Sequence, residues 1–284
     1  MKARHRILLF ALAVASTPVT LSVMGQAPVT AALSARLGSV VFHWDELPLK
    51  PSATGGRRDV ANQPTATLEN LECHVSTLNP GLTSHPPHHH PQEELIIIKQ
   101  GTIEVRLNGK AQRAGPGSLL FFAANDLHNM TNVGDTPATY VVFQLTTAAT
   151  HSVPAGTAAE AARPGMLPSG VFAWEKLEVK STKTGERRAV FDSPTATFAH
   201  FECNVTTLNP GEIPHAAHHH PDEEIVIVKD GTLQVEINGA AHRAGPDSIV
   251  FYGSGDEHGM KNIGPGPATY YVVRVVTEAT PKPG

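Results

Sequence analysis

The sequence predicts an all-β protein made of two similar tandem domains. Three observations predict this fold class. Short apolar runs rich in β-branched residues are separated by turn signals, and the 284 residues include 23 prolines and 24 glycines. Many segments of the second half repeat the first half at a constant offset. No stretch of about ten residues shows the roughly 3.6-residue hydrophobic period of a helix. Strands at this spacing form a sandwich or a barrel.

Identical short segments define the repeat. The segment Thr77–Gly81 recurs as Thr207–Gly211, and His88–Pro91 recurs as His218–Pro221, both at an offset of 130 residues. Solenoid repeats are shorter, about 20–50 residues. The offset therefore indicates a duplicated domain.

Each copy contains a series of predicted strands. Ile103, Val105 and Leu107 alternate with polar residues, and the following Asn108-Gly109 is typical of a hairpin turn. The other predicted strands of the first copy are 94–99, 118–123 and 140–145. In the second copy, 224–229 corresponds to 94–99.

The N-terminus has the pattern of a secretory signal peptide. Basic residues at Lys2, Arg4 and Arg6 precede a short apolar run, so residues 1–25 are predicted to direct the chain to a secreted or periplasmic location. The alternative, a membrane anchor, is disfavoured because the apolar run is too short to span a bilayer. No later segment predicts a membrane span.

An Ala/Pro/Gly-rich stretch from 148 to 170 is predicted to link the copies. We therefore place the first domain at 26–150 and the second at 151–284. The two cysteines, Cys73 and Cys203, lie within predicted strands at equivalent positions. Two buried free thiols are favoured over a disulfide, which would need close approach at a pseudo-twofold axis.

The net charge of −4 argues against a nucleic-acid partner, because such proteins usually present a basic face. We instead expect a small-molecule substrate or ligand. The sequence leaves open whether the chain forms homo-oligomers.

Histidines and glutamates recur at a spacing that predicts a metal site in each copy. His88, His90 and Glu94 fall on one face of an extended chain, and a lone histidine follows a later strand. Three imidazoles and one carboxylate suit a borderline divalent transition metal. The predicted ligands are His88, His90, Glu94 and His128 in the first copy, and His218, His220, Glu224 and His258 in the second.

These motifs resemble those of the cupin superfamily. The first cupin motif, Gly…His-x-His…Glu…Gly, occurs twice, and so does the second, a turn residue followed by His and Asn. The matching residues are Gly81, Gly101, Asn125 and Asn132 with the first ligand set, and Gly211, Gly231, Gly255 and Asn262 with the second. Asn125 replaces the usual turn glycine, and asparagine tolerates a positive φ.

The resemblance implies two tandem jelly-roll β-barrels, each with one metal ion. Manganese or iron is favoured, with zinc, nickel or copper as alternatives. It also implies a dioxygenase-like metalloenzyme acting on a small polar or phenolic substrate. Two alternatives stay open: a non-catalytic metal or ligand binding protein, and a manganese-dependent hydrolase or lyase.

His85 and His215 distinguish this sequence from one bicupin group. Oxalate decarboxylases carry an arginine three residues before the His-x-His pair, where this chain has His85 and His215, so oxalate chemistry is not expected. We interpret these two histidines as candidate catalytic proton shuttles.

Two further positions bear on ligand recognition. The twin arginines Arg57-Arg58 and Arg187-Arg188 could clamp a carboxylate, but pairing with acidic residues across the domain interface is favoured because both copies keep them. Gln144 and Arg274 are equivalent but chemically different. If they face the cavities, the two sites recognise different ligands.

Overall fold

The computed structural model describes residues 36–154, 156 and 164–282. The predicted signal peptide and part of the predicted linker lie outside these residues. Within them the elements are strands and short 3-10 helices, which confirms the all-β prediction. None of the described helices is long and apolar enough to cross a membrane.

The two copies fold into the same series of elements. The first comprises β1 (Val40–Phe42), η1 (Trp44–Glu46), β2 (Lys50–Ser52), β3 (Gly55–Gln63), β4 (Asn70–Leu78), β5 (Glu93–Gln100), β6 (Ile103–Leu107), β7 (Lys110–Ala114), β8 (Leu119–Phe122), β9 (His128–Asn132), β10 (Ala138–Thr146) and η2 (Ala148–Ser152). The second comprises β11 (Gly170–Phe172), η3 (Trp174–Lys176), β12 (Lys180–Thr182), β13 (Gly185–Ser193), β14 (His200–Leu208), β15 (Glu223–Asp230), β16 (Leu233–Ile237), β17 (Ala240–Ala244), β18 (Ile249–Tyr252), β19 (His258–Asn262) and β20 (Ala268–Val276).

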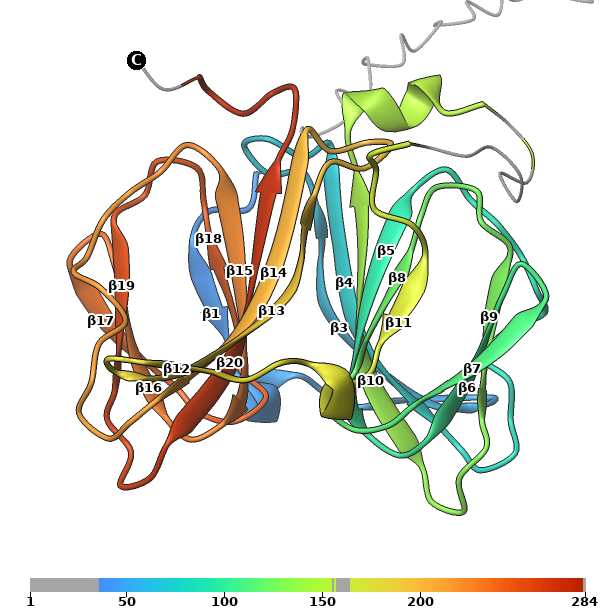
Figure 1. Cartoon of the computed structure of the whole chain (residues 1–284), viewed down its shortest axis with the longest axis horizontal. Coiled ribbons are helices and arrows are strands. Elements are labelled where there is room, and N and C mark those ends of the chain that lie inside the picture. The colour runs from blue at the N-terminus through green and yellow to red at the C-terminus, as the bar shows by residue number, and fades with distance from the viewer. Residues whose placement is uncertain (1–35, 155, 157–163, 283–284) are drawn as a thin grey trace, which may run out of the picture. The chain divides into compact units, whose positions relative to one another are not determined.

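Each jelly roll pairs a seven-stranded sheet with a three-stranded sheet (Figure 1). We call the jelly roll built mainly from the first copy barrel 1 and the one built mainly from the second copy barrel 2. The strand orders of barrel 1 are β11-β8-β5-β10-β4-β3-β2 and β7-β6-β9. Those of barrel 2 are β1-β18-β15-β20-β14-β13-β12 and β17-β16-β19. Apolar side chains from both sheets fill each interior, as with Ile96 of β5, Val105 of β6 and Met130 of β9. The predicted hairpin turn is confirmed, because Asn108 and Gly109 both have positive φ.

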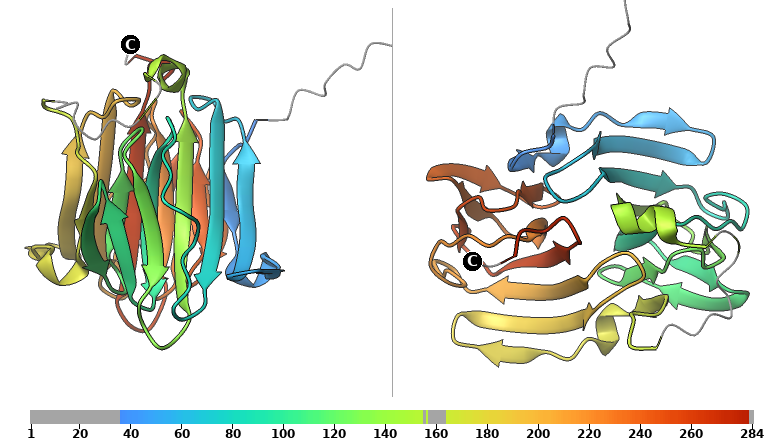
Figure 2. Two further views of the ribbon diagram at one scale, coloured as in Figure 1. Left: turned by 90° about the vertical axis from the view of Figure 1, so that its right-hand side faces the viewer. Right: turned by 90° about the horizontal axis from the view of Figure 1, so that it is seen from above.

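The barrels exchange their edge strands. β1 belongs to the first copy but pairs antiparallel with β18 of barrel 2, and β11 pairs with β8 of barrel 1 (Figures 1 and 2). Val41 packs against the interior of barrel 2, and Val171 against that of barrel 1. Each barrel is therefore completed by residues of the other copy.

A hydrophobic core is shared between the barrels. Phe121 of barrel 1 contacts Phe201 and Phe191 of barrel 2, with ring centroids 5.7 and 6.2 Å apart. Cys73 and Cys203 are buried in this core as free cysteines, as predicted. Burial raises the pKa of both thiols, so neither is poised to react.

Two buried carboxylates cross the interface reciprocally. Glu93 of β5 accepts hydrogen bonds from the hydroxyls of Thr195 and Thr197 and from the backbone N–H groups of Ala196 and Thr197. Glu223 of β15 accepts from the Thr65 hydroxyl at 2.7 Å and from the backbone N–H groups of residues 66 and 67 at 3.0 and 3.2 Å. The loops 64–67 and 194–197 thus each hold the carboxylate that precedes a predicted metal ligand.

Candidate metal centres

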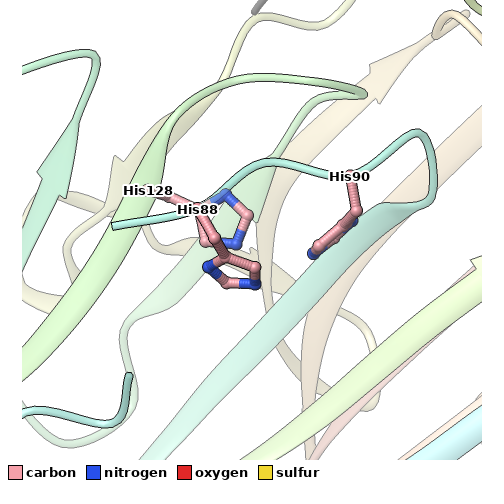
Figure 3. Close-up of side chains that lie close together, drawn as sticks. All are labelled: His88, His90 and His128. Atoms are coloured by element: carbon pink, nitrogen blue, oxygen red, sulfur yellow. The ribbon is translucent and has the colours of Figure 1, made fainter. Parts of the chain in front are cut away.

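The predicted ligands of the first copy come together in barrel 1. His88 and His90 lie on the loop that leads into β5, Glu94 is the second residue of that strand, and His128 begins β9. The backbones of His88 and His128 form a reciprocal pair of hydrogen bonds of 3.1 and 3.0 Å. Figure 3 shows the imidazoles of His88 and His90, from the loop before β5, close to that of His128 from β9.

The imidazole nitrogens converge. One ring nitrogen from each of His88, His90 and His128 lies within 4.8 Å of the others. The Nδ1–H groups of His90 and His128 donate to the carbonyl oxygens of Gln92 and Asp126 at 2.9 and 2.8 Å, so Nε2 is the nitrogen that each ring offers as a ligand atom. Glu94 adds a carboxylate oxygen 3.2 Å from Nε2 of His90.

Barrel 2 repeats this arrangement. His218, His220 and His258 bring ring nitrogens within the same 4.8 Å. Glu224 places an oxygen 3.5 Å from Nε2 of His220. The structure therefore brings together the three predicted histidines of each set and places the predicted glutamate beside one of them.

Unpaired buried nitrogens show that both clusters fit a cation. Nδ1 of His88 and Nε2 of His128 are buried without a hydrogen-bond partner. The same holds for Nδ1 of His218 and for Nε2 of His220 and His258. Buried polar atoms are rarely left unpaired, and several imidazole lone pairs beside one carboxylate form a donor set for a divalent ion.

Aromatic rings and turns fix the lone histidine of each set. His128 stacks on Phe122 with centroids 4.3 Å apart, and His258 stacks on Tyr252 at 4.4 Å. The turn before each histidine contains a residue of positive φ, 63° at Asn125 and 80° at Gly255. Asn125 thus adopts the turn conformation of its glycine counterpart.

Burial and charge act differently on the members of the first set. Burial lowers the pKa of His128 to about 4, so its imidazole is neutral at pH 7. Burial also opposes charge on His90, but its contact with Glu94 outweighs this and raises the pKa of His90. Despite burial, the same contact lowers the pKa of Glu94, which stays ionised.

A cavity opens over each cluster. The barrel 1 cavity has a volume of about 330 Å³, and the barrel 2 cavity about 340 Å³. His88 and Glu94 line the first, and His218 and Glu224 line the second. A small molecule in either cavity would therefore contact the metal-ligand set.

His85 and His215 also line the cavities. The ring centroid of His85 lies 3.9 Å from that of His88, and that of His215 lies 4.4 Å from that of His218. Their Nδ1–H groups donate to the carbonyl oxygens of Pro86 and Ala216. Each Nε2 is thus left as a proton acceptor.

The favoured interpretation of the twin arginines is wrong. Arg57 pairs with Asp59 and Glu72 of its own barrel, both at 2.6 Å, and lines the cavity. Arg58 stacks over Trp44 and donates to the carbonyl oxygen of Leu47. Acidic partners across the interface do not hold these residues, because β3 directs Arg57 toward acids on its own sheet.

Several cavity residues lie on strands that no sequence motif singled out, two positions from β5 and β15 in the same sheets. Glu72 and His74 of β4 line the first cavity, where β14 supplies Glu202 and Asn204 to the second. Their alternation with buried Leu71, Cys73 and Val75 is the signal that could have placed them on the inner face.

Comparison with known proteins identifies the fold family. The cupin domain model matches residues 74–144 and 204–274, which together make up half of the chain. No curated protein sequence matches the chain.

Several solved structures are similar at low sequence identity. Lactobacillus farciminis oxalate decarboxylase in a formate complex has a TM-score of 0.63 and 16% identity, covering 86% of this chain and 88% of that one. Protein Ylba from E. coli has a TM-score of 0.66 and 11% identity, covering 86% and 95%. A variant of Bacillus subtilis oxalate decarboxylase has a TM-score of 0.63 and 14% identity, covering 86% and 79%.

These likenesses show the fold alone, because the identities are low. The family match falls on both copies and contains all eight predicted ligand residues. The chain therefore belongs to the cupin family, as a protein with two cupin domains.

Proposed function

We propose that this protein is a bicupin metalloenzyme with one manganese or iron ion in each barrel. It acts on a small polar or phenolic molecule in the manner of a dioxygenase. The observation that carries the proposal is that His88, whose Nδ1 is buried without a hydrogen-bond partner, and Glu94 both line a cavity of about 330 Å³. A purely structural site would be closed by protein ligands, whereas these sites leave room for a substrate.

A bound ion would supply Lewis-acid or redox chemistry at the cavity wall. The chain's own residues bind and orient the substrate and handle protons. His85 is fixed by its bond to Pro86 and offers Nε2 to a substrate hydroxyl. Tyr140 also lines this cavity, and burial raises its pKa to about 12, so it stays a neutral hydrogen-bonding group.

A manganese-dependent lyase or hydrolase is the second candidate. The similar structures include oxalate decarboxylase with Mn(II) centres. Arginines in both cavities, Arg57 and Arg187, favour it, although His85 and His215 stand where those enzymes carry arginine. A binding protein without turnover is the third.

Metal analysis and oxygen uptake distinguish these functions. Protein from the native host should contain two manganese or iron ions per chain and consume oxygen with members of a panel of catechols, keto acids and dicarboxylates. Product release without oxygen uptake would favour the lyase or hydrolase. Full metal content without turnover would favour the binding protein, and fewer than one ion per chain would refute the two-site proposal.

Separate ligand variants show which barrel reacts. His128→Ala and His258→Ala should each lose about one ion per chain, because each removes one of four ligands. Activity lost in only one variant would identify the catalytic barrel. Full metal content in both variants would mean that the ligand assignment is wrong.

The proton-shuttle role has its own test. His85→Gln should keep the metal of barrel 1 but lower kcat, because glutamine cannot accept and pass on a proton. His89→Gln, at an exposed neighbour, is the matched control. An unchanged kcat in a variant that keeps its metal would leave His85 without a catalytic role.

We also propose that the chain is exported to a secreted or periplasmic location. Residues 1–25 have the charge and apolar pattern of a signal peptide. N-terminal sequencing of protein from the native host should begin near residue 26, and an intact Met1 terminus would refute this.

A further inference from the structure

The two cavities differ most in their arginines. Arg57 lines the first cavity, whereas both Arg187 and Arg274 line the second. Each cavity also contains two glutamates, one of them a predicted metal ligand. The lining of barrel 2 therefore carries one more positive charge than that of barrel 1.

Arg274 lies directly beside the metal-ligand set. In the sheet of barrel 2 it is the cross-strand neighbour of both Glu224 and Glu202. Side chains opposite one another on neighbouring strands point to the same face. A ligand held by Arg274 would therefore lie next to the metal ligands.

The equivalent position in barrel 1 is neutral. Gln144 is the cross-strand neighbour of Glu94 and Glu72, and its amide nitrogen lies 3.4 Å from Nε2 of His90. A glutamine here offers hydrogen bonds without charge. Barrel 1 and barrel 2 thus place different side chains, Gln144 and Arg274, at equivalent positions of β10 and β20.

Glu202 brings the two arginines of barrel 2 together. Its Oε1 accepts from Nη2 of Arg187 at 2.9 Å, and its Oε2 lies 3.5 Å from Nη1 of Arg274. Arg274 also donates through Nε to Asp222 at 2.7 Å, which fixes its guanidinium. Two guanidinium groups are therefore held on either side of a single carboxylate.

Both guanidinium groups keep unused donors. Among the described residues, Nη2 of Arg274 and the Nε and Nη1 groups of Arg187 have no hydrogen-bond partner. By contrast, Arg57 donates through two of its nitrogens, from Nε to Asp59 and from Nη2 to Glu72. The residue equivalent to Asp59 in barrel 2 is Ala189, so Arg187 lacks that second partner.

We infer that barrel 2 recognises a small carboxylate through Arg274 and Arg187, whereas barrel 1 takes an uncharged ligand group through Gln144. Planar guanidinium groups with free N–H donors match a carboxylate. The side chains of Arg274 and Arg187 are 37% and 51% exposed, so a ligand in the cavity can reach them. The inference deepens the proposed function, because it assigns a substrate class to one barrel.

Equilibrium binding of succinate to the manganese-loaded chain tests this inference. Isothermal titration calorimetry should give one succinate per chain, with succinamide binding much more weakly because it lacks the charge. Arg274→Gln should weaken succinate binding by about tenfold or more, the loss expected for a charge-assisted hydrogen bond. The succinate affinity of Arg274→Lys should lie between those of the native chain and Arg274→Gln, because lysine keeps the positive charge but lacks the parallel N–H donors of a guanidinium group.

Matched controls in barrel 1 locate the site. Arg57→Gln and Gln144→Ala should leave the succinate affinity within about twofold, because the charged site lies in the other barrel. The inference is overturned if either variant weakens binding as much as Arg274→Gln does. It is also overturned if succinamide binds as well as succinate, and phosphate binding as tightly as succinate would overturn the carboxylate assignment.

Metal content, measured on the same samples, separates this inference from the proposed function. Two ions per chain without succinate binding would overturn the inference and leave the metalloenzyme proposal standing. Succinate binding that depends on Arg274 in a chain that retains no metal would support the inference and overturn the metalloenzyme proposal. Circular dichroism of Arg274→Gln checks that the variant is folded. Arg187→Gln should also weaken succinate binding, which tests the same site through its second arginine.

Discussion

Removing the carboxylate of Glu93 should destabilise the pair of barrels rather than one of them. Glu93 is 1% exposed and accepts four hydrogen bonds from the loop 194–197 of the other barrel. Glu93→Ala leaves two hydroxyls and two N–H groups without their acceptor. Glu93→Gln keeps an oxygen for one N–H group but turns an amide NH₂ toward the remaining donors.

The magnitude follows from these contacts. Hydrogen bonds to a charged acceptor contribute about 1.5–3 kcal/mol each, but the buried carboxylate loses its hydration on folding, which offsets part of this sum. We therefore expect the free energy of unfolding to fall by about 4 kcal/mol in Glu93→Ala and about 2 kcal/mol in Glu93→Gln.

Urea-induced unfolding of the metal-free protein measures this change. The metal must be removed, because Glu93 precedes the predicted ligand Glu94. Tryptophan fluorescence is a suitable signal, since Trp174 of the second copy packs close to Gly117 of the first. Glu46→Gln, at an exposed position in η1, is the matched control.

A double-mutant cycle tests the contact itself. Thr195→Val removes one hydroxyl that donates to Glu93. Thr195→Val should lower the free energy of unfolding less in the Glu93→Gln background than in the native chain, by about 0.5 kcal/mol or more. The reasoning is refuted if Glu93→Ala unfolds within about 0.5 kcal/mol of the control, or if the two substitutions are additive.

Three other outcomes are expected. Despite its burial, the neighbouring carboxylates of Asp222 and Glu224 raise the pKa of His220 to about 9, so metal binding at pH 7 must displace a proton. The metal affinity of barrel 2 should therefore rise by about tenfold per pH unit up to about pH 9, and calorimetry in buffers of different ionisation enthalpy should detect the released proton. Gly117→Ala should lower stability by about 1–3 kcal/mol in urea unfolding, because its φ is +86° and a Cβ would lie 2.8 Å from ring atoms of Trp174. Val41→Ala should weaken barrel 2 by roughly 1 kcal/mol although it lies in the first copy, and hydrogen exchange should increase at β18 more than at β8.

The sequence by itself determined the fold class, the duplication and the ligand sets. Alternation and turn residues depend on neighbours in the chain, so Asn108-Gly109 and the strand that starts near Glu94 could be recognised locally. The ligand spacing is also local, because an extended segment places His88 and His90 on one face. The link to His128 is not local, since it rested on a lone histidine after a later strand and on the cupin resemblance. The structure brings that residue to His88 and His90, and metal binding itself stays a prediction.

The tertiary structure decided what depends on contacts between distant residues. The exchange of β1 and β11 and the reciprocal bonds of Glu93 and Glu223 join segments that lie from about 50 to about 210 residues apart, for which no local pattern exists. The partners of Arg57 were misjudged for the same reason, since strand register determines them. The difference between Gln144 and Arg274 was visible in the sequence. That both residues face a cavity beside the metal-ligand glutamate was decided by the packing of β10 and β20 in their sheets.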